Sequence, residues 1–246
     1  RIDTFRFEER RLLEHCAALL ARGAYADALV VVTDRGSSFW VEREVGRKAQ
    51  WELCRRVAAL GLAMQAVSGD LPPASAGPAA WVERYAAPEG WHRVDGAQRA
   101  LETWRGQMAD APACEQAIAL VLRDHEKLLH KLAQRFSSAL AANGWTVAGA
   151  LHQTRIHPTV VEPRPGVVAY LLIDALRYEM GAELARLLDG VEDLQLQPAI
   201  AALPSITPVG MAALLPGAAT DFDVVAHGSD LAAWVDGGIV ATAKDR

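Results

Sequence analysis

The stretch that decides the fold is Val167-Val168-Ala169-Tyr170-Leu171-Leu172-Ile173-Asp174. Its first seven residues are apolar throughout, which is typical of a strand buried on both faces of a mostly parallel sheet. A helix is expected next, over residues 178–188. Further strands are expected over residues 194–201 and 222–226, with a helix over 208–215 between them. Strands and helices that alternate at this spacing predict a layered α/β domain.

Residues 1–160 are expected to form a mainly helical domain, and residues 161–246 to contain the α/β domain. Within the helical part, the β-branched run over residues 29–33 predicts a strand. A turn follows it and leads into residues 39–41, so a short strand pair is expected there.

The most regular helix is expected over residues 114–140, where apolar residues form one continuous stripe. Asn143-Gly144 follows it as a C-terminal cap. His125 lies on the apolar stripe, so we expect a buried histidine there and not a metal ligand.

The chain has 246 residues, of which 51% are hydrophobic and 22% are charged. This composition excludes bulk disorder and collagen-like repeats. No apolar run approaches the roughly 18 residues that a membrane helix needs, so no membrane association is expected. The three cysteines, Cys16, Cys54 and Cys114, form no paired motif. They argue against a disulfide scaffold or a cysteine zinc site and favour a reducing cytoplasm.

Charge differs between the two parts of the chain. Residues 1–165 carry 21 basic and 19 acidic side chains, whereas residues 166–246 carry 4 basic and 11 acidic ones. Arginines scattered over a nearly neutral segment differ from the clustered basic stripe typical of nucleic-acid binding. The acidity of the C-terminal part suits a site that holds cations.

Asp174 and Thr207 are the residues best placed for chemistry. Ligands of open α/β sheets bind outside the carboxyl ends of the strands, where Asp174 is expected. A carboxylate there suits a divalent cation and equally suits a helix cap. Thr207 precedes Pro208, which favours the first helical position, so the Thr207 hydroxyl is expected at an N-cap beside free backbone N–H groups. Such a hydroxyl can attack phosphorus, or it can simply cap the helix.

Together these residues resemble the arrangement of the alkaline phosphatase superfamily. There, a strand-end Asp is followed by a hydroxyl nucleophile, which stands 33 residues later in this chain and ten residues before Gly217. Two segments are similar, more narrowly, to the PglZ family of bacterial BREX phage-defence systems: Leu172-Ile173-Asp174-Ala175-Leu176-Arg177-Tyr178-Glu179-Met180 and residues 204–217. The resemblance is specific over residues 166–217 and looser elsewhere.

The resemblance implies a helical N-terminal region followed by the first part of an alkaline-phosphatase-like three-layer α/β/α domain. It implies that Asp174 is a metal ligand and that Thr207 is both the nucleophile and a metal ligand, with Ser205 as the alternative nucleophile. Two zinc ions are expected. Arg177 is expected either to contact a phosphate oxygen or to pair with an acid such as Glu179.

The function implied is a metal-dependent phosphohydrolase, of phosphodiesterase or nuclease type, in a cytoplasmic phage-defence system with other defence proteins. Its substrate would be a phosphate ester, such as a nucleic acid or nucleotide. The superfamily's later Asp-His-Gly stretch is absent from this sequence. We therefore expect the front part of a longer protein, inactive alone, with the remaining metal ligands beyond residue 246.

Two other functions stay open. One is a non-catalytic scaffold of a defence complex with a phosphatase-like fold. The other is a helical regulatory protein with a nucleotide-binding α/β domain, although the sequence has no glycine-rich phosphate loop.

Overall fold

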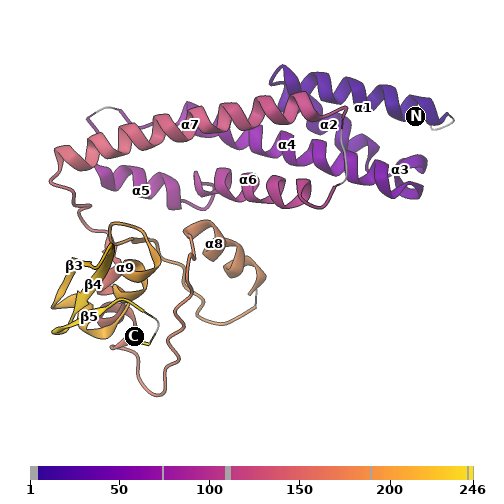
Figure 1. The fold of residues 1–246 in the computed structure, drawn as a ribbon. Helices are drawn as coiled ribbons and strands as arrows, with labels where there is room; N and C mark the ends of the chain where they lie inside the picture. The colour runs from indigo at the N-terminus through magenta and orange to yellow at the C-terminus, as the bar shows by residue number, and fades with distance from the viewer. Residues whose placement is uncertain (1–4, 74, 109–111, 189, 243, 246) are drawn as a thin grey trace. The chain divides into compact units, whose positions relative to one another are not determined.

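The computed structural model describes residues 5–73, 75–108, 112–188, 190–242 and 244–245. The chain divides into two compact units, Arg1–Trp145 and Thr146–Arg246. The first unit is helical, and the second combines short helices with two small sheets (Figure 1). A helical region followed by a partial α/β region is therefore confirmed. Among the described residues, no helix is long and apolar enough to cross a membrane.

The first unit is a bundle built around α4 and α7. Its described residues form α1 (Arg6–Ala21), α2 (Tyr25–Arg35), α3 (Phe39–Arg43), α4 (Val45–Gly69), α5 (Pro78–Ala86), α6 (His92–Arg105) and α7 (Glu115–Ala142). Helix α4 packs against α2, α6 and α7, and α7 also contacts α1 and α5 (Figure 1). The side chains between them form one continuous buried apolar cluster, so this unit has its own hydrophobic core.

Helix α7 follows the predicted apolar stripe. Ile118, Val121 and Leu128 on that stripe are buried. Gly144 takes a left-handed conformation, with φ +64°, just after the helix ends at Ala142. His125 is buried on the same face, as expected. Burial lowers the pKa of its imidazole, and the charges of nearby acids oppose that effect.

The prediction of a strand pair in this unit is wrong. Residues 29–33 lie inside helix α2, and residues 39–41 lie inside α3. The reason is that Tyr25, Ala28 and Val32 share one helical face and bury it in the core, which outweighs the strand preference of the β-branched residues. Gly61 of α4 permits this close packing, because a side chain there would overlap the ring of Tyr25.

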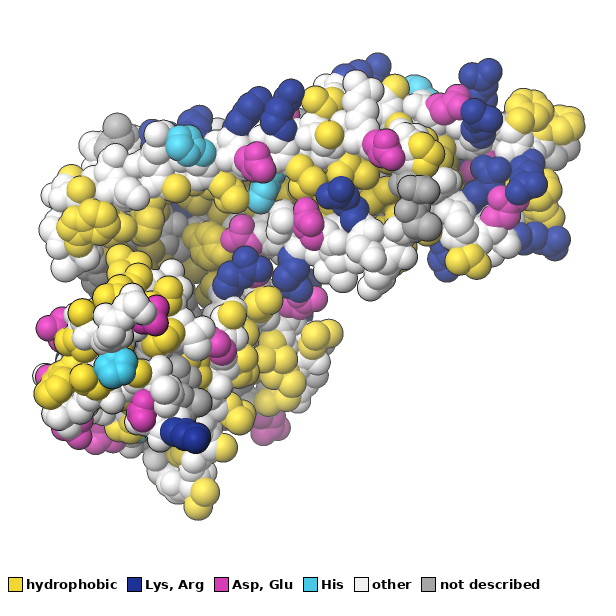
Figure 2. Space-filling model, viewed as in Figure 1, with side chains coloured by type: hydrophobic (Ala, Val, Ile, Leu, Met, Phe, Trp, Pro, Cys, Tyr) yellow, Lys and Arg dark blue, Asp and Glu magenta, His cyan; other side chains and the backbone are white. Residues whose placement is uncertain are grey.

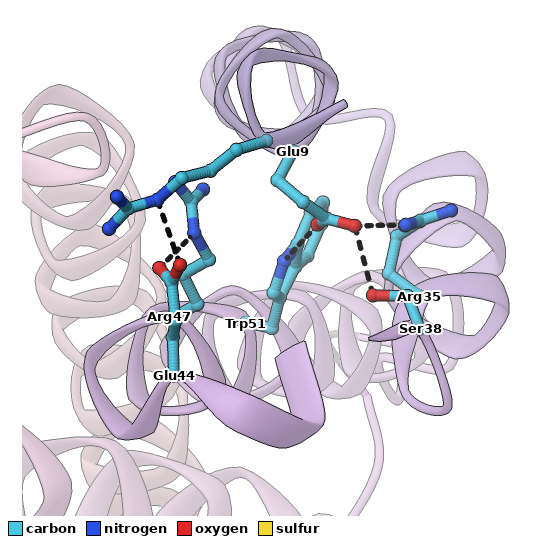
Figure 3. Close-up of polar contacts among 7 residues, drawn as sticks. Glu9, Arg35, Ser38, Glu44, Arg47 and Trp51 are labelled. Carbon is cyan, nitrogen blue, oxygen red and sulfur yellow. Dashed lines mark hydrogen bonds and ion pairs between the residues drawn. The ribbon is translucent and has the colours of Figure 1, made fainter. Parts of the chain in front are cut away.

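The buried carboxylate of Glu9 links the first helices of the bundle through hydrogen bonds and an ion pair (Figure 3). Glu9 of α1 is 1% exposed and forms an ion pair with Arg35 of α2. Its Oε1 also accepts a hydrogen bond from Ser38 Oγ at 2.9 Å, and its Oε2 accepts one from Trp51 Nε1 at 3.2 Å. Because every partner donates to the carboxylate, the charge of Glu9 is compensated inside the core.

The second unit contains two separate small sheets. Its described elements are β1 (Leu151–His152), a 3-10 turn (Gln153–Arg155), a π turn (His157–Val161), α8 (Tyr178–Leu187), β2 (Ala199–Ile200), α9 (Thr207–Ala212), a second 3-10 turn (Pro216–Ala219), β3 (Phe222–His227), β4 (Asp230–Val235) and β5 (Gly238–Val240). Strands β1 and β2 pair in parallel, and β3, β4 and β5 form an antiparallel sheet. Helix α9 packs against β4, and small clusters of buried apolar side chains lie beside it.

The predictions for this unit have mixed outcomes. The expected helices over 178–188 and 208–215 and the strand over 222–226 are confirmed as α8, α9 and β3, within a few residues. The expected strand over 194–201 is reduced to β2.

The stretch Val167 to Ile173 forms no strand in the structure. Leu171 is 80% exposed and Ile173 is 52% exposed. A strand buried on both faces needs neighbouring strands on either side, and the described residues supply none for this stretch.

Candidate functional site

Asp174 and Thr207 lie in direct contact, although 33 residues separate them in the sequence. The hydroxyl Oγ1 of Thr207 donates to the Asp174 carboxylate, at 3.1 Å from Oδ2 and 3.3 Å from Oδ1. Both residues are exposed, so the pair is open to solvent and to a ligand. The structure therefore brings together the two residues that the sequence singled out for chemistry.

The backbone after Asp174 turns sharply. The N–H of Ala175 donates to Asp174 Oδ1 at 2.9 Å, and Ala175 takes a left-handed conformation with φ +56°. That conformation costs a residue with a Cβ about 1–2 kcal/mol. The hydrogen bond orients the carboxylate and leaves its other oxygen, Oδ2, close to Thr207.

Tyr170 fixes the segment that leads to Asp174. Its hydroxyl donates to the carbonyl oxygen of Leu214, just after α9, at 3.1 Å. Its ring lies against that of His157, with centroids 5.9 Å apart, and burial raises the pKa of the phenol. The anchor explains how an irregular segment is held beside α9, the helix that carries Thr207.

Thr207 is the first residue of α9, and Ile206 is the N-cap. The expectation that Thr207 itself caps the helix is therefore wrong by one residue. Pro208 occupies the second helical position, so the Thr207 side chain projects from the first turn and reaches Asp174.

Gln153 holds the loop before α9 and is a residue that the sequence did not reveal. Its Nε2 donates to the carbonyl oxygen of Gly210 in α9 at 2.8 Å, and its Oε1 accepts the N–H of Ala202 at 3.0 Å. Both contacts are with backbone groups, far along the chain, so no pattern of side chains announces them. Gln153 follows β1 directly and thus links the parallel strand pair to the Thr207 loop.

Gly217, at the end of the segment that resembles PglZ, has a packing reason to be glycine. An added Cβ there would lie 2.7 Å from the Cβ of Asp236, in the turn between β4 and β5. A side chain at this position would push that turn away from the region after α9.

Arg177 forms an ion pair with Glu179, with Nη2 2.8 Å from Oε1. Glu179 is buried, whereas the Arg177 side chain is 55% exposed, so the guanidinium both compensates the carboxylate and reaches solvent. Pairing was one of the two roles considered for Arg177, and contact with a phosphate stays a prediction. Ser205 is exposed, and no hydrogen bond joins it to Asp174 in the described part of the chain.

The donor atoms at Asp174 and Thr207 fit part of a site for a hard divalent cation, because both residues supply oxygen. They are only two ligands. Within the described residues, no group of three or more His, Cys, Asp or Glu side chains gathers in a way that could hold a metal ion. A complete metal site would need ligands in addition to this pair.

Comparison with known protein families finds that most of the second unit is similar to an alkaline phosphatase-like class of domain. The family model that matches is the BREX system PglZ alkaline phosphatase-like domain, over residues 151–246. The resemblance seen in the sequence is therefore confirmed for this part of the chain. Searches of curated proteins and of solved structures found no match.

Proposed function

We propose that this chain is part of a metal-dependent phosphohydrolase, of phosphodiesterase or nuclease type, in a BREX phage-defence system. The observation that carries the proposal is the contact between Thr207 Oγ1 and the Asp174 carboxylate at 3.1 Å. It joins a hydroxyl nucleophile to an acidic group inside a domain that matches the PglZ model. The PglZ match also supports partners among other proteins of the same defence system.

Thr207 is the proposed nucleophile. Its Oγ1 loses its proton to solvent and attacks phosphorus, so that a bond from Oγ1 to phosphorus forms. The bond from phosphorus to the leaving oxygen breaks, and that oxygen takes up a proton from solvent and departs as an alcohol. Asp174 orients the hydroxyl and accepts its hydrogen bond before the attack. Water then releases phosphate, or a phosphate monoester when the substrate is a diester, and regenerates the threonine.

Asp174 and Thr207 are the proposed ligands of a divalent cation, with two zinc ions expected at the complete site. Bound cations would supply charge that favours the alkoxide of the nucleophile and the developing charge on the leaving oxygen. The acidic C-terminal part, with 11 acidic and 4 basic side chains after residue 165, is compatible with such cations. In the view of Figure 2, the Lys and Arg side chains lie mainly over the helices of the first unit.

Arg177 is the proposed contact for a phosphate oxygen of the substrate. Its side chain is 55% exposed and lies three residues after Asp174, so it can reach solvent near the pair while it neutralises Glu179. A guanidinium with several N–H donors can serve both groups together.

The activity test uses the purified protein and a chromogenic phosphodiester, with zinc added. Thr207→Ala and Asp174→Ala should each lower kcat/KM by roughly 10³-fold or more. The matched control is Ser205→Ala, two residues from Thr207, which should change kcat/KM less than about twofold. A chelator should abolish turnover, and zinc should restore it. Full activity of Thr207→Ala together with a loss in Ser205→Ala would transfer the nucleophile to Ser205. A turnover by this chain that survives Asp174→Ala would contradict the proposed role of the pair.

A non-catalytic scaffold is the second candidate, and the independent core of the helical unit favours it. In that case residues 1–145 should co-purify with other defence proteins, and Asp174→Ala should leave phage protection intact. Loss of protection in Asp174→Ala, with unchanged protein level, would favour the hydrolase.

A further inference from the structure

Three cysteines that are widely spaced in the sequence converge in the core of the first unit. Cys16, Cys54 and Cys114 are each 0% exposed, and all three are free thiols. The Sγ atoms of Cys54 and Cys114 lie 3.3 Å apart, although 60 residues separate them along the chain. Cys16 Sγ forms its own hydrogen bond, with the carbonyl oxygen of Ala28 at 3.8 Å. Sequence spacing did not reveal the pair, because the two residues meet only when α4 and α7 pack.

The two thiols of the pair have different surroundings. Cys114 is the N-cap of α7, a helix of 28 residues, and the N-terminus of a helix favours a negative charge on sulfur. The hydrogen bond with Cys54 lowers the pKa of the Cys114 thiol. The hydrogen bond with Cys114, then one with Cys16, and then burial raise the pKa of the Cys54 thiol. Because Cys114 stands at the N-terminus of α7, in contact with the Cys54 sulfur, it is the nucleophilic partner of the pair.

Cys114 also lies next to the surface of the unit. Pro112 and Ala113, which directly precede it, are exposed. The N-cap of α7 has no side-chain hydrogen bond that caps the helix. Opening of this first turn would therefore admit a small reagent to Cys114 without disrupting the middle of the bundle.

We propose that Cys54 and Cys114 are an oxidation site that closes into a disulfide when the protein meets hydrogen peroxide. The Cys114 thiolate attacks a peroxide oxygen, so that an S–O bond forms, the O–O bond breaks and water leaves after protonation. Cys54 then attacks the Cys114 sulfur. The S–S bond forms, the S–O bond breaks, and a second water leaves with the Cys54 proton. One peroxide is reduced while two thiols are oxidised.

Closure needs only a small movement, since a disulfide bond of about 2.0 Å replaces a sulfur–sulfur separation of 3.3 Å. The bond would join the middle of α4 to the start of α7 and so lock two helices that carry much of the core.

The test treats the native chain with a small excess of hydrogen peroxide, then unfolds it and alkylates every thiol that is still free. Peptide mass spectrometry should find Cys54 linked to Cys114, with Cys16 alkylated, and a reductant should restore all three thiols. Three free thiols after peroxide, or a link between Cys16 and Cys54, would overturn the proposal.

Two variants separate the roles of the cysteines. Cys16→Ser should still form the Cys54–Cys114 link. Cys54→Ala should form no link and should trap a sulfenic acid on Cys114, which dimedone labels. Absence of that label in folded Cys54→Ala, checked by circular dichroism, would contradict the attack by Cys114.

Discussion

The two units of this chain bury their apolar residues to very different extents. In the helical unit, residues far apart along the chain share one large core. The leucines of this core that are less than 2% exposed are Leu20, Leu53, Leu60 and Leu101. Among the described residues of the second unit, the buried apolar clusters are small, and Leu171, Leu187 and Leu203 are 80%, 77% and 64% exposed. Helices satisfy their backbone locally and need only one covered face, whereas a central strand needs neighbours on both sides.

The largest stability effect is expected at Glu9. Glu9→Gln removes the charge that compensates buried Arg35, so the free energy of unfolding of the helical unit should fall by about 3–5 kcal/mol. Urea denaturation, followed by far-UV circular dichroism, measures the change. The control is Glu14→Gln in the same helix, where exposed ion pairs with Arg10 and Arg11 are lost and the change should stay below about 1 kcal/mol. Equal effects of the two variants would show that the Glu9 network does not hold the bundle.

A pair of leucine variants tests the contrast in burial directly. Leu53→Ala, at a residue 1% exposed, should lower the free energy of unfolding by about 2–5 kcal/mol. Leu171→Ala, at a residue 80% exposed, should change it by less than about 0.5 kcal/mol. Denaturation of both variants under the same conditions provides the measurement. A large loss in Leu171→Ala would show that residues 167–173 are buried, as their sequence predicts.

A smaller and pH-dependent effect is expected at His125. Burial lowers the pKa of its imidazole, so the unfolded state binds the proton more readily than the folded state. The helical unit should therefore be most stable above the ordinary histidine pKa of about 6.5 and should lose stability as the pH falls through that value.

Unfolding of the wild type and of His125→Leu at neutral and mildly acidic pH measures this effect. His125→Leu should lose part of the acid sensitivity, whereas His130→Leu, at an exposed position five residues later, should retain it. Identical pH dependence in wild type and His125→Leu would show that the His125 imidazole does not cause the loss of stability at acidic pH.

The sequence predicted the local parts of the molecule better than the non-local ones. The apolar stripe of α7 and the buried His125 follow from helical periodicity alone, since each contact on the stripe comes from a fixed spacing. The prediction of a strand over residues 29–33 was wrong because packing of α2 against α4 overrides the strand preference of these residues. Residues 167–173 form no strand, although their sequence predicts one, because a strand needs neighbouring strands to pair with. A local sequence pattern does not show whether such neighbours are present.

The sequence likewise predicted some residues of the candidate site and missed others. Asp174 and Thr207 could be singled out from spacing and family resemblance, and the structure brings them into contact. Gln153 and Tyr170, which hold the two segments in place, could not be predicted because their bonds reach backbone groups in distant segments. The Cys54–Cys114 contact was missed for the same reason.

The most direct test of the proposed site is a double-mutant cycle on Asp174 and Thr207, with kcat/KM for a phosphodiester as the readout. If the two side chains act as one unit, Asp174→Ala, Thr207→Ala and the double variant should all lose activity by a similar factor, roughly 10³-fold or more. If the double variant instead loses the product of the two single factors, the residues act independently, and the contact at 3.1 Å is not the centre of the site.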